Sequence, residues 1–293
     1  AFFAAVFPPN IFLVLRYAFF LLILTSIEKA HLEGFGNTET VLREKAKLLQ
    51  AVHRDGIVVI PDTLDVSGCK IDARQIKVGK TSTADVRIET AINSEGFAML
   101  TMEGSTVTLS MLGEHNAMNA ALALVAAKHA NSNISVMTLL DRASSTCAAD
   151  GRLCKIEVGG IVFLDDSYNA NPASMRSAME LFAKLKATRK VLVLGDMLEL
   201  GDDAALWHSR AGRAAAALQP ALLCALGPHA RDLCGGALEA GLSEDSVAVV
   251  SDHSGAVRAV VALWKRGDTV LVKGSRGAGM ERVVELLKEE ALR

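Results

Sequence analysis

The second half of the chain repeats one pattern, in which short apolar or β-branched runs alternate with stretches of helical periodicity. After the first run, Met175, Ala178, Met179 and Phe182 recur at helical spacing behind Pro172, a residue that suits the first turn of a helix. Strands that alternate with helices through short connections form a parallel sheet with helices on both faces. We therefore predict a Rossmann-like, doubly wound α/β domain over residues 150–293, with strands at 161–165, 190–194, 221–226, 247–250 and 269–272 and a last helix at 281–292.

The hydrophobic pattern of the first half is less regular. It predicts one buried strand at 57–60, and its next strand-like segments, 86–90, 97–102 and 106–111, are punctuated by Gly96 and Glu103-Gly104, which is typical of antiparallel pairing. Helices are expected at 116–129 and 134–143. Residues 144–150 are small and polar, so we place there the boundary between a domain over 25–149 and the domain over 150–293.

The first 24 residues form an atypical apolar segment. Six of the ten phenylalanines lie within residues 1–20, and residues 11–27 are almost wholly apolar apart from Arg16. A membrane anchor, a signal peptide and a buried strand preceded by foreign sequence all remain open. The run is near the lower limit of about 17 residues for a membrane span, and it lacks a basic start and a clear cleavage site. Arg16 and the strand-like residues 21–27 argue against a membrane partner.

Composition narrows the class of protein. A length of 293 residues suggests about two domains, and 51% hydrophobic with 22% charged residues is a globular balance. A net charge of −2 and only 5% aromatic residues argue against a nucleic-acid partner. The five cysteines contain no CxxC pair, which excludes a zinc ribbon or disulfide framework and indicates a cytoplasmic protein.

One segment imitates a phosphate-binding loop. Gly79-Lys80-Thr81 matches the end of that motif, but Arg74 stands where its first glycine is required. That glycine allows the loop to turn its backbone N–H groups toward phosphate. We therefore predict that 79–81 is not a phosphate loop.

Five other segments, in this order, resemble the Mur ligases of peptidoglycan synthesis. The resemblance implies a central ATP-binding domain, incomplete here, followed by the Rossmann-like domain. It also implies a reaction in which ATP phosphorylates the carboxylate of UDP-N-acetylmuramoyl-tripeptide and an amine attacks the acyl phosphate, with Mg²⁺ on the phosphates. The segments are 30–36 (AHLEGFG), 113–120 (GEHNAMNA), 165–172 (DDSYNANP), 195–201 (GDMLELG) followed by His208, and 273–276 (KGSR) followed by Met280 and Glu281.

The resemblance assigns two residues to magnesium. His31 occupies the position of a metal-contacting histidine, and Lys45 that of a lysine whose carbamate holds a second ion; Lys47 is the alternative by register. On residue type alone, His31 reads as a loop histidine and Lys45 as part of a solvated helix face.

The resemblance also assigns a nucleotide site. Asn116 and Asn119 would contact the adenine, Arg152 the ATP phosphates and Asp166 the ribose hydroxyls. A guanidinium suits a polyphosphate because its fork binds two oxygens. Asn116 is also expected to cap its helix, and Asp166 could instead cap the turn before Pro172.

The remaining candidates follow predicted strands of the second domain. By resemblance they bind the incoming dipeptide or its metal-bound partner, and otherwise they form an ordinary polar rim of a doubly wound sheet. They are Tyr168, Asn169, Asn171, Asp196, Glu199, His208, Lys273 and Ser275.

Segments 165–172 and 195–201 favour the branch of the family that adds D-alanyl-D-alanine. In that branch a UDP-binding domain and a glycine-rich phosphate loop precede residue 31, and neither is found in these 293 residues. Pro61-Asp62-Thr63 also replaces an expected asparagine-containing segment. We therefore expect that the chain turns over poorly or not at all by itself. We also expect a monomer. The alternatives are a non-catalytic nucleotide-binding module and a related amide-forming ligase such as folylpolyglutamate synthase.

Overall fold

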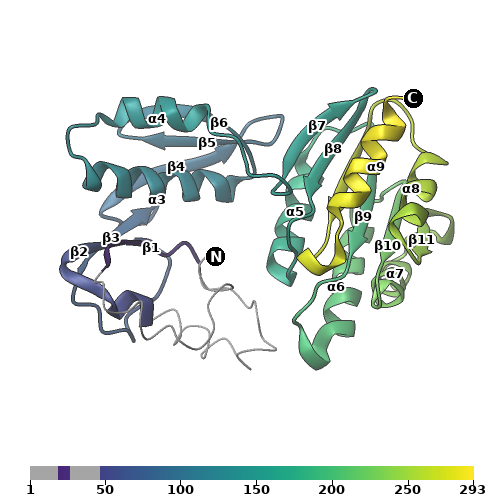
Figure 1. The fold of residues 1–293 in the computed structure, drawn as a ribbon, viewed down its shortest axis with the longest axis horizontal. Coiled ribbons are helices and arrows are strands. Elements are labelled where there is room, and N and C mark those ends of the chain that lie inside the picture. Colours follow the sequence, from purple (N-terminus) through teal and green to yellow (C-terminus); the bar gives the residue numbers. More distant parts are fainter. Residues whose placement is uncertain (1–18, 27–46) are drawn as a thin grey trace.

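The computed structural model describes residues 19–26 and 47–293, which form two sheets with their own helices (Figure 1). The first sheet has the order β1-β2-β3-β4-β5-β6. Strands β1 to β4 run parallel, and β4, β5 and β6 form an antiparallel meander. The bounds are β1 Phe19–Ile23, β2 Val52–Pro61, β3 Arg74–Gly79, β4 Val86–Ile92, β5 Phe97–Met102 and β6 Ser105–Leu112, followed by α3 Glu114–Ala130 and α4 Val136–Ser144.

The core of this first domain lies between the sheet and its two helices. Side chains alternate along β5, so that Ala98, Leu100 and Met102 are buried while their neighbours are half-exposed. These residues pack against α3 and α4 through side chains such as Leu122 and Leu139. The alternation that predicted an antiparallel portion therefore results from a sheet with one covered face.

The second sheet has the order β11-β10-β9-β12-β8-β7, in which only β7 is antiparallel. Hydrophobic cores lie on both faces of this second sheet. Leu192 and Leu194 of β9 face α5, α6 and α7, whereas Val191 and Val193 face α8 and α9. The bounds are β7 Cys154–Val158, β8 Ile161–Asp166, α5 Pro172–Lys184, β9 Arg189–Gly195, α6 Ala204–Ala216, β10 Leu222–Leu226, α7 Ala230–Glu239, β11 Val247–Val250, α8 His253–Val261, β12 Asp268–Lys273 and α9 Glu281–Ala291.

The return of β12 to the middle of the sheet creates a switch point. The chain passes from β8 to β9 and outward to β11, then comes back so that β12 pairs with both β8 and β9. Ligands of such sheets bind outside the carboxyl ends of the strands at this kind of reversal. In Figure 1 these ends lie at the lower side of the second domain, where α9 begins.

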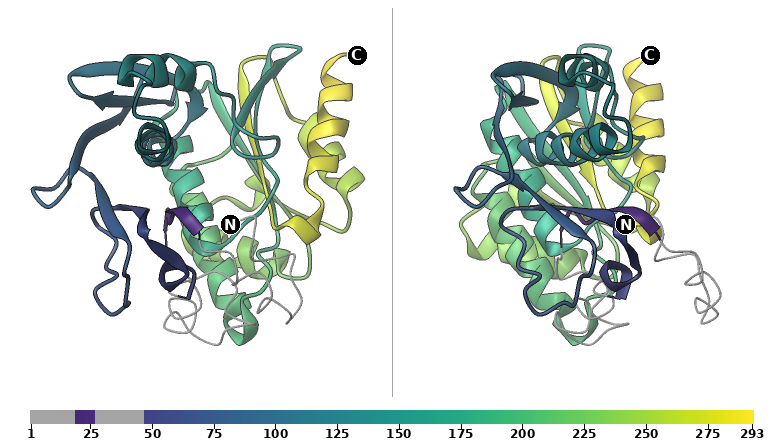
Figure 2. Two further views of the ribbon diagram at one scale, coloured as in Figure 1. Left: turned by 60° about the vertical axis from the view of Figure 1, so that its left-hand side comes forward. Right: turned by 90° about the vertical axis from the view of Figure 1, so that its left-hand side faces the viewer.

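The two domains touch at the turn between β4 and β5. Figure 2 shows the ribbon from two further sides. Gly96, between β4 and β5, lies against Leu185 and Leu181 at the end of α5. Beside it, Lys155 of β7 pairs with Glu95 at 3.1 Å. The chain crosses between the domains through residues 145–153.

The α/β, doubly wound prediction is confirmed, and the five predicted strands of residues 150–293 are present within one or two residues. Strands β3 and β7 were not predicted from the sequence. The assignment of Asn116 as a helix cap is wrong, because α3 begins at Glu114 after Gly113 and the Asn116 amide donates to the Leu112 carbonyl. Within residues 19–26 and 47–293, no helix is both long and apolar enough to cross a membrane.

Candidate functional site

The carboxyl ends of β8 and β12 are joined by a buried ion pair. The Lys273 ammonium donates to Asp166 Oδ2 at 2.6 Å and to the Asn169 carbonyl at 2.9 Å. The Lys273 side chain is 1% exposed and that of Asp166 14%. Burial raises the pKa of the Asp166 carboxyl, and the ammonium opposes that effect. The pair therefore fixes the loop after β8 to the neighbouring strand.

Ser275 connects three of the resembling segments. Its hydroxyl donates to the Ala170 carbonyl at 2.9 Å and accepts the Leu198 N–H at 2.8 Å. Its own N–H donates to the Asp196 carbonyl at 2.8 Å. Because Ser275 is only 3% exposed, these bonds are shielded from water. The loops after β8, β9 and β12 thus form one unit, which we call the carboxyl-end rim (residues 165–171, 196–200 and 273–278).

Two guanidinium groups flank an aromatic ring at this rim. Arg152 lies 4.0 Å from the centroid of Tyr168, and Arg276 lies 5.7 Å from it. Gly151 brings Arg152 to this position, because its φ is +69° and a Cβ there would lie 2.9 Å from the Tyr168 nitrogen. Both arginines are exposed, so their forks are accessible to an anion.

Asn169 and Asn171 serve the local fold of the rim. Asn171 caps α5, its Oδ1 accepting the Ser174 N–H while the Ser174 hydroxyl accepts the Asn171 N–H. The Asn169 side chain accepts the Ala170 N–H. The Asn171 amide oxygen is thus occupied within the chain, and the exposed Asn169 stays a candidate for substrate contact.

Asp196 begins the rim segment after β9, and His208 of α6 supports that segment. His208 is fully buried, and its Nε2 accepts the Met197 N–H at 2.9 Å while Nδ1 donates to the Ala204 carbonyl at 2.7 Å. Burial lowers the pKa of His208, although the Ala204 carbonyl and Asp196 oppose this. A neutral ring with both nitrogens engaged supports the loop after β9, so the predicted direct contact of His208 with substrate does not fit this geometry.

A hollow of about 420 Å³ opens beside Asp196, at the carboxyl ends of β9, β10 and β11. Its walls are mainly apolar, and Asp196 is one of the residues that line it. Glu199 is exposed on the loop nearby, with a φ of +62°. The lining residues are Asp196, Leu198, Leu226, Gly227, Pro228, Ser251, Asp252, His253, Gly277 and Ala278.

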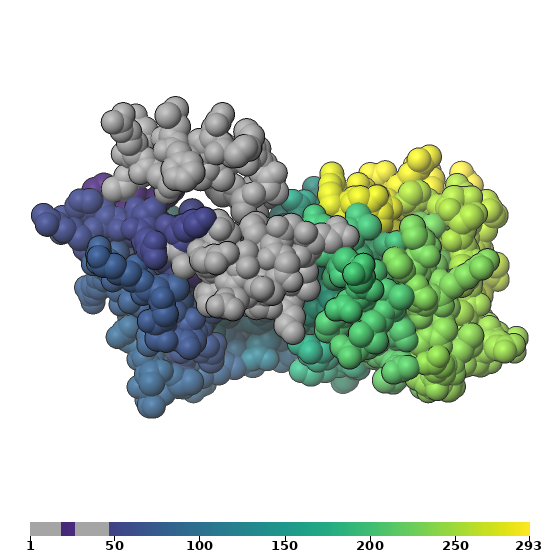
Figure 3. All heavy atoms as spheres, turned by 90° about the horizontal axis from the view of Figure 1, so that it is seen from below, coloured from purple at the N-terminus to yellow at the C-terminus, as the bar shows by residue number. Residues whose placement is uncertain are grey.

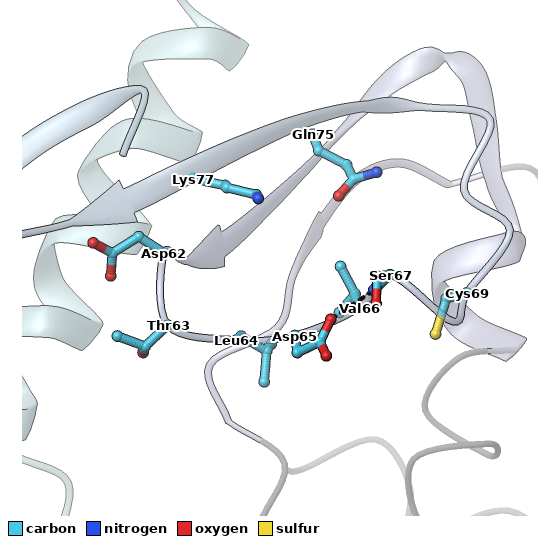
Figure 4. Close-up of a pocket in the computed structure, with 9 residues that line it drawn as sticks. All are labelled: Asp62, Thr63, Leu64, Asp65, Val66, Ser67, Cys69, Gln75 and Lys77. Atoms are coloured by element: carbon cyan, nitrogen blue, oxygen red, sulfur yellow. Dashed lines mark hydrogen bonds between the residues drawn. The ribbon is translucent and has the colours of Figure 1, made fainter. Parts of the chain in front are cut away.

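The first domain has a second hollow, of about 350 Å³ (Figure 4). The loop after β2 forms one wall, and Lys77 and Gln75 of β3 lie across from it. Its carboxylates are engaged within the chain, since Asp62 accepts the Thr81 N–H at 2.7 Å and Asp65 accepts the Ser67 N–H at 2.9 Å. Hydrogen bonds from Thr81 hold the pKa of Asp62 below its ordinary value against the effect of burial.

The segment that imitates a phosphate loop, 79–81, has a different role. Gly79 ends β3, no helix follows it, and Lys80 pairs with Glu114 at 2.7 Å. The prediction that 79–81 is no phosphate loop is consistent with this strand-and-turn geometry.

The two residues predicted to contact adenine lie on α3. Asn119 is exposed on α3, one turn after Asn116.

His31 and Lys45 lie outside the described residues. Lys47, the alternative to Lys45, is exposed at the start of the second described stretch. Among the described residues no group of three or more His, Cys, Asp or Glu side chains could hold a metal.

Figure 3 shows the two domains side by side from below, with the first in blue and the second in green to yellow.

Two residues that contact the rim segments were not predicted from the sequence, Arg276 as a neighbour of Tyr168 and His229 as a neighbour of Asp196. Arg276 was noted only as part of a motif, and its position opposite Tyr168 depends on the fold of the loop after β12. The backbone of His229 donates to Asp196 Oδ1 at 3.1 Å, and its ring stacks on His208 at 4.7 Å. The loop after β10 carried no sequence signal beyond the Gly227-Pro228 turn.

Comparison with known proteins identifies both domains. The Mur ligase middle domain matches residues 14–127, and the Mur ligase glutamate ligase domain matches residues 151–276. The UDP-N-acetylmuramoyl-tripeptide–D-alanyl-D-alanine ligase of Mycobacterium tuberculosis is 30% identical over 97% of this chain, and the chain spans 59% of that relative's length.

Solved structures agree on the fold. MurF ligase from Thermotoga maritima in complex with ADP superposes with a TM-score of 0.80 at 23% identity, covering 98% of this chain and 66% of that one. MurF from Acinetobacter baumannii gives a TM-score of 0.77 at 28% identity, covering 91% of this chain and 60% of that one. Two successive domains, the sequence relative and the fold thus lead to one conclusion: the chain belongs to the Mur ligase family.

Proposed function

We propose that this chain is the ATP-binding and amine-binding part of a ligase that joins D-alanyl-D-alanine to UDP-N-acetylmuramoyl-tripeptide. The observation that carries the proposal is the carboxyl-end rim, in which Ser275 bonds two segments that lie 77 and 105 residues away in the chain. The relative from Mycobacterium tuberculosis carries this activity in its name.

The proposed chemistry is phosphoryl transfer followed by amide formation. The terminal phosphoryl group of ATP passes to the tripeptide carboxylate with release of ADP, and the dipeptide amine then displaces phosphate as the C–N bond forms. Positioning and neutralisation of phosphate charge dominate such a reaction. Arg152 and Arg276 fit this task, because two exposed guanidinium groups converge on one ring.

The other rim residues would hold this arrangement in place. Lys273 is bonded to Asp166 and Asn169, so it positions the loop that carries Tyr168. Asp166, at the end of β8, remains the candidate for the ribose hydroxyls, and Asn116 and Asn119 for the adenine. Mg²⁺ would neutralise phosphate oxygens when bound, with His31 and a carbamate formed on Lys45 (or Lys47) as its proposed ligands.

Nucleotide binding is the first test, because we expect turnover by these 293 residues to be slow. We expect Arg152→Ala to weaken MgATP binding about tenfold, through loss of charge-assisted hydrogen bonds to phosphate. Arg142→Ala is the matched control, since Arg142 is an exposed arginine on α4. Equal affinity of the Arg152 and Arg142 variants would contradict the assignment.

Phosphate release is the second test. The purified chain is supplied with MgATP, UDP-N-acetylmuramoyl-tripeptide and D-alanyl-D-alanine, and each substrate is omitted in turn. We expect slow release that requires all three. Release that continues at the same rate without D-alanyl-D-alanine would contradict the proposed reaction and indicate hydrolysis of ATP alone.

A further inference from the structure

The guanidinium group of Arg152 is held by an aromatic face. Its central carbon lies 4.0 Å from the centroid of the Tyr168 ring, well inside the limit of about 6 Å for a cation–π contact. Within residues 19–26 and 47–293, no carboxylate pairs with this guanidinium. Arg152 is exposed, so its N–H donors are accessible to a ligand. The ring is therefore the partner that sets the direction of this side chain.

Arg276 approaches the same ring in a different way. Its guanidinium lies 5.7 Å from the Tyr168 centroid, and its Nη1 donates to Glu281 Oε1 at 3.3 Å. A carboxylate partner occupies one edge of a guanidinium and offsets its charge, whereas an aromatic face leaves every edge free. Of the two arginines beside the ring, Arg152 is thus the one whose full charge and donor set remain available to a polyanion.

The residues on either side of Tyr168 fix the position of its ring. Before it, Ser167 is 1% exposed, and its hydroxyl donates to Asp165 Oδ1 at 2.6 Å. After it, the Asn169 carbonyl accepts the buried Lys273 ammonium at 2.9 Å. Tyr168 itself is half-buried. A ring carried on a backbone that is bonded on both sides is suited to hold another side chain in place.

The backbone of Arg152 is tied to the same place. The Gly151 carbonyl accepts the Tyr168 N–H at 2.9 Å, and the Arg152 N–H donates to the Ala149 carbonyl at 3.1 Å. On the other side, Leu153 is 6% exposed and packs into the core of the second domain. The long Arg152 side chain is thus the part that still has rotamer freedom to lose. A contact that fixes it before a ligand binds lowers the entropy cost of binding.

We propose that Tyr168 is a positioning residue, whose ring holds one face of the Arg152 guanidinium so that its free edge meets the phosphates of ATP. This inference rests on the proposed function, in which Arg152 binds those phosphates. It assigns Tyr168 an action through Arg152, in place of the contact with the dipeptide that the family resemblance implies.

Equilibrium binding of MgATP to ring variants tests the proposal. Tyr168→Leu keeps an apolar side chain but removes the aromatic face, so we expect affinity to fall about five- to tenfold. Tyr168→Met repeats this test with a second apolar side chain. Tyr168→Phe keeps the face and should bind MgATP within about twofold of the unaltered chain. The urea midpoint of each variant reports whether the protein is folded.

The chain offers a matched control for the loss of a ring beside an arginine. Trp207 of α6 lies outside the carboxyl-end rim, and the Arg210 guanidinium is 4.8 Å from the centroid of its ring. Trp207→Leu should leave MgATP affinity within about twofold. A loss equal to that of Tyr168→Leu would show that the affinity does not depend on the ring at position 168 specifically, and it would overturn the proposal.

A second background separates positioning from direct contact with the nucleotide. In Arg152→Ala, adding Tyr168→Leu should weaken MgATP binding by less than about twofold, because the ring then has no guanidinium to hold. Adenosine has no phosphate for Arg152 to bind. We therefore expect Tyr168→Leu and the unaltered chain to bind adenosine equally well, as measured by titration followed by NMR.

The outcomes separate this inference from the proposed function. Unchanged MgATP affinity in Tyr168→Leu, equal losses in Tyr168→Phe and Tyr168→Leu, or additive effects with Arg152→Ala overturn the positioning role while the ligase proposal stands. Weaker adenosine binding by Tyr168→Leu shows a direct contact with the nucleoside and also overturns it. Equal MgATP affinity of Arg152→Ala and Arg142→Ala contradicts the phosphate role of Arg152 in the proposed function itself.

Discussion

Each domain contains a lysine–carboxylate pair of nearly the same length, yet the two pairs differ in their surroundings. Lys273 and Asp166 of the second domain lie 2.6 Å apart with side chains 1% and 14% exposed. Lys80 and Glu114 of the first lie 2.7 Å apart, with side chains 51% and 46% exposed. Hydrogen bonding from Lys80 lowers the pKa of Glu114, whereas burial raises that of Asp166. Desolvation thus outweighs pairing only where water is excluded.

The largest expected effect is the loss of the buried cation. Lys273→Met leaves Asp166 without its partner, and we expect the free energy of unfolding of the second domain to fall by about 3–5 kcal/mol. Lys80→Met removes the exposed partner, and we expect a change of about 0–1 kcal/mol. Urea unfolding of both variants measures the difference.

A double variant sharpens this test. Asp166→Asn combined with Lys273→Met removes both charges, so it should recover more than half of the stability lost in Lys273→Met. A Lys273→Met variant as stable as Lys80→Met would show that the buried pair contributes no more than the exposed one.

Ser275 gives the next largest effect. Ser275→Ala leaves the Leu198 N–H and the Ala170 carbonyl without their buried partner, and we expect a loss of about 1–3 kcal/mol. Ser110→Ala is the control, because the exposed Ser110 hydroxyl donates to the Ser144 carbonyl where water can replace it. Thermal unfolding of the two variants should rank them in this order, and equal midpoints would contradict a structural role for Ser275.

Differences in burial between strands also explain which of them could be predicted from the sequence. Strands β9 and β12 are continuous apolar runs because both of their faces are covered, so their positions were predicted within a residue or two. Strand β3 begins with the exposed Arg74 and Gln75 and carries Lys77 between its buried residues. β7 is an edge strand with alternating exposed residues. Neither has the apolar run that identified the others.

The candidate site could also be predicted only in part from local sequence patterns. Segment resemblance located Asp166 and Lys273 at strand ends, but their pairing across 107 residues depends on β12 lying beside β8. Nothing in a local pattern specifies that strand order. The cap of α3 was assigned wrongly for a related reason, since Gly113 provides no side-chain cap and Asn116, which could have provided one, bonds back to Leu112.

The pH dependence of stability should distinguish the buried His208 from the exposed His129. His208 is buried and its pKa is lowered from the ordinary 6.5, so below about pH 6.5 the unfolded chain binds a proton that the folded chain does not. The stability of the second domain should therefore decrease as the pH falls from 6.5 toward the pKa of the folded state. His208→Gln should remove this slope, and His129→Gln, on the exposed end of α3, should retain it. Urea midpoints from about pH 5 to about pH 8 measure both.

The smallest effect is expected where the two domains meet. Lys155 and Glu95 form an ion pair across the contact, but their side chains are 31% and 62% exposed, so Lys155→Met should change stability by about 0–1 kcal/mol. That small effect should vanish in about 1 M salt, which screens exposed charges. Leu185, against which Gly96 packs, is the apolar counterpart, and Leu185→Ala should cost more than Lys155→Met at every salt concentration. If Lys155→Met instead costs more stability than Leu185→Ala, exposure does not decide the strength of charge pairs in this protein, and the contrast between Lys273–Asp166 and Lys80–Glu114 needs another cause.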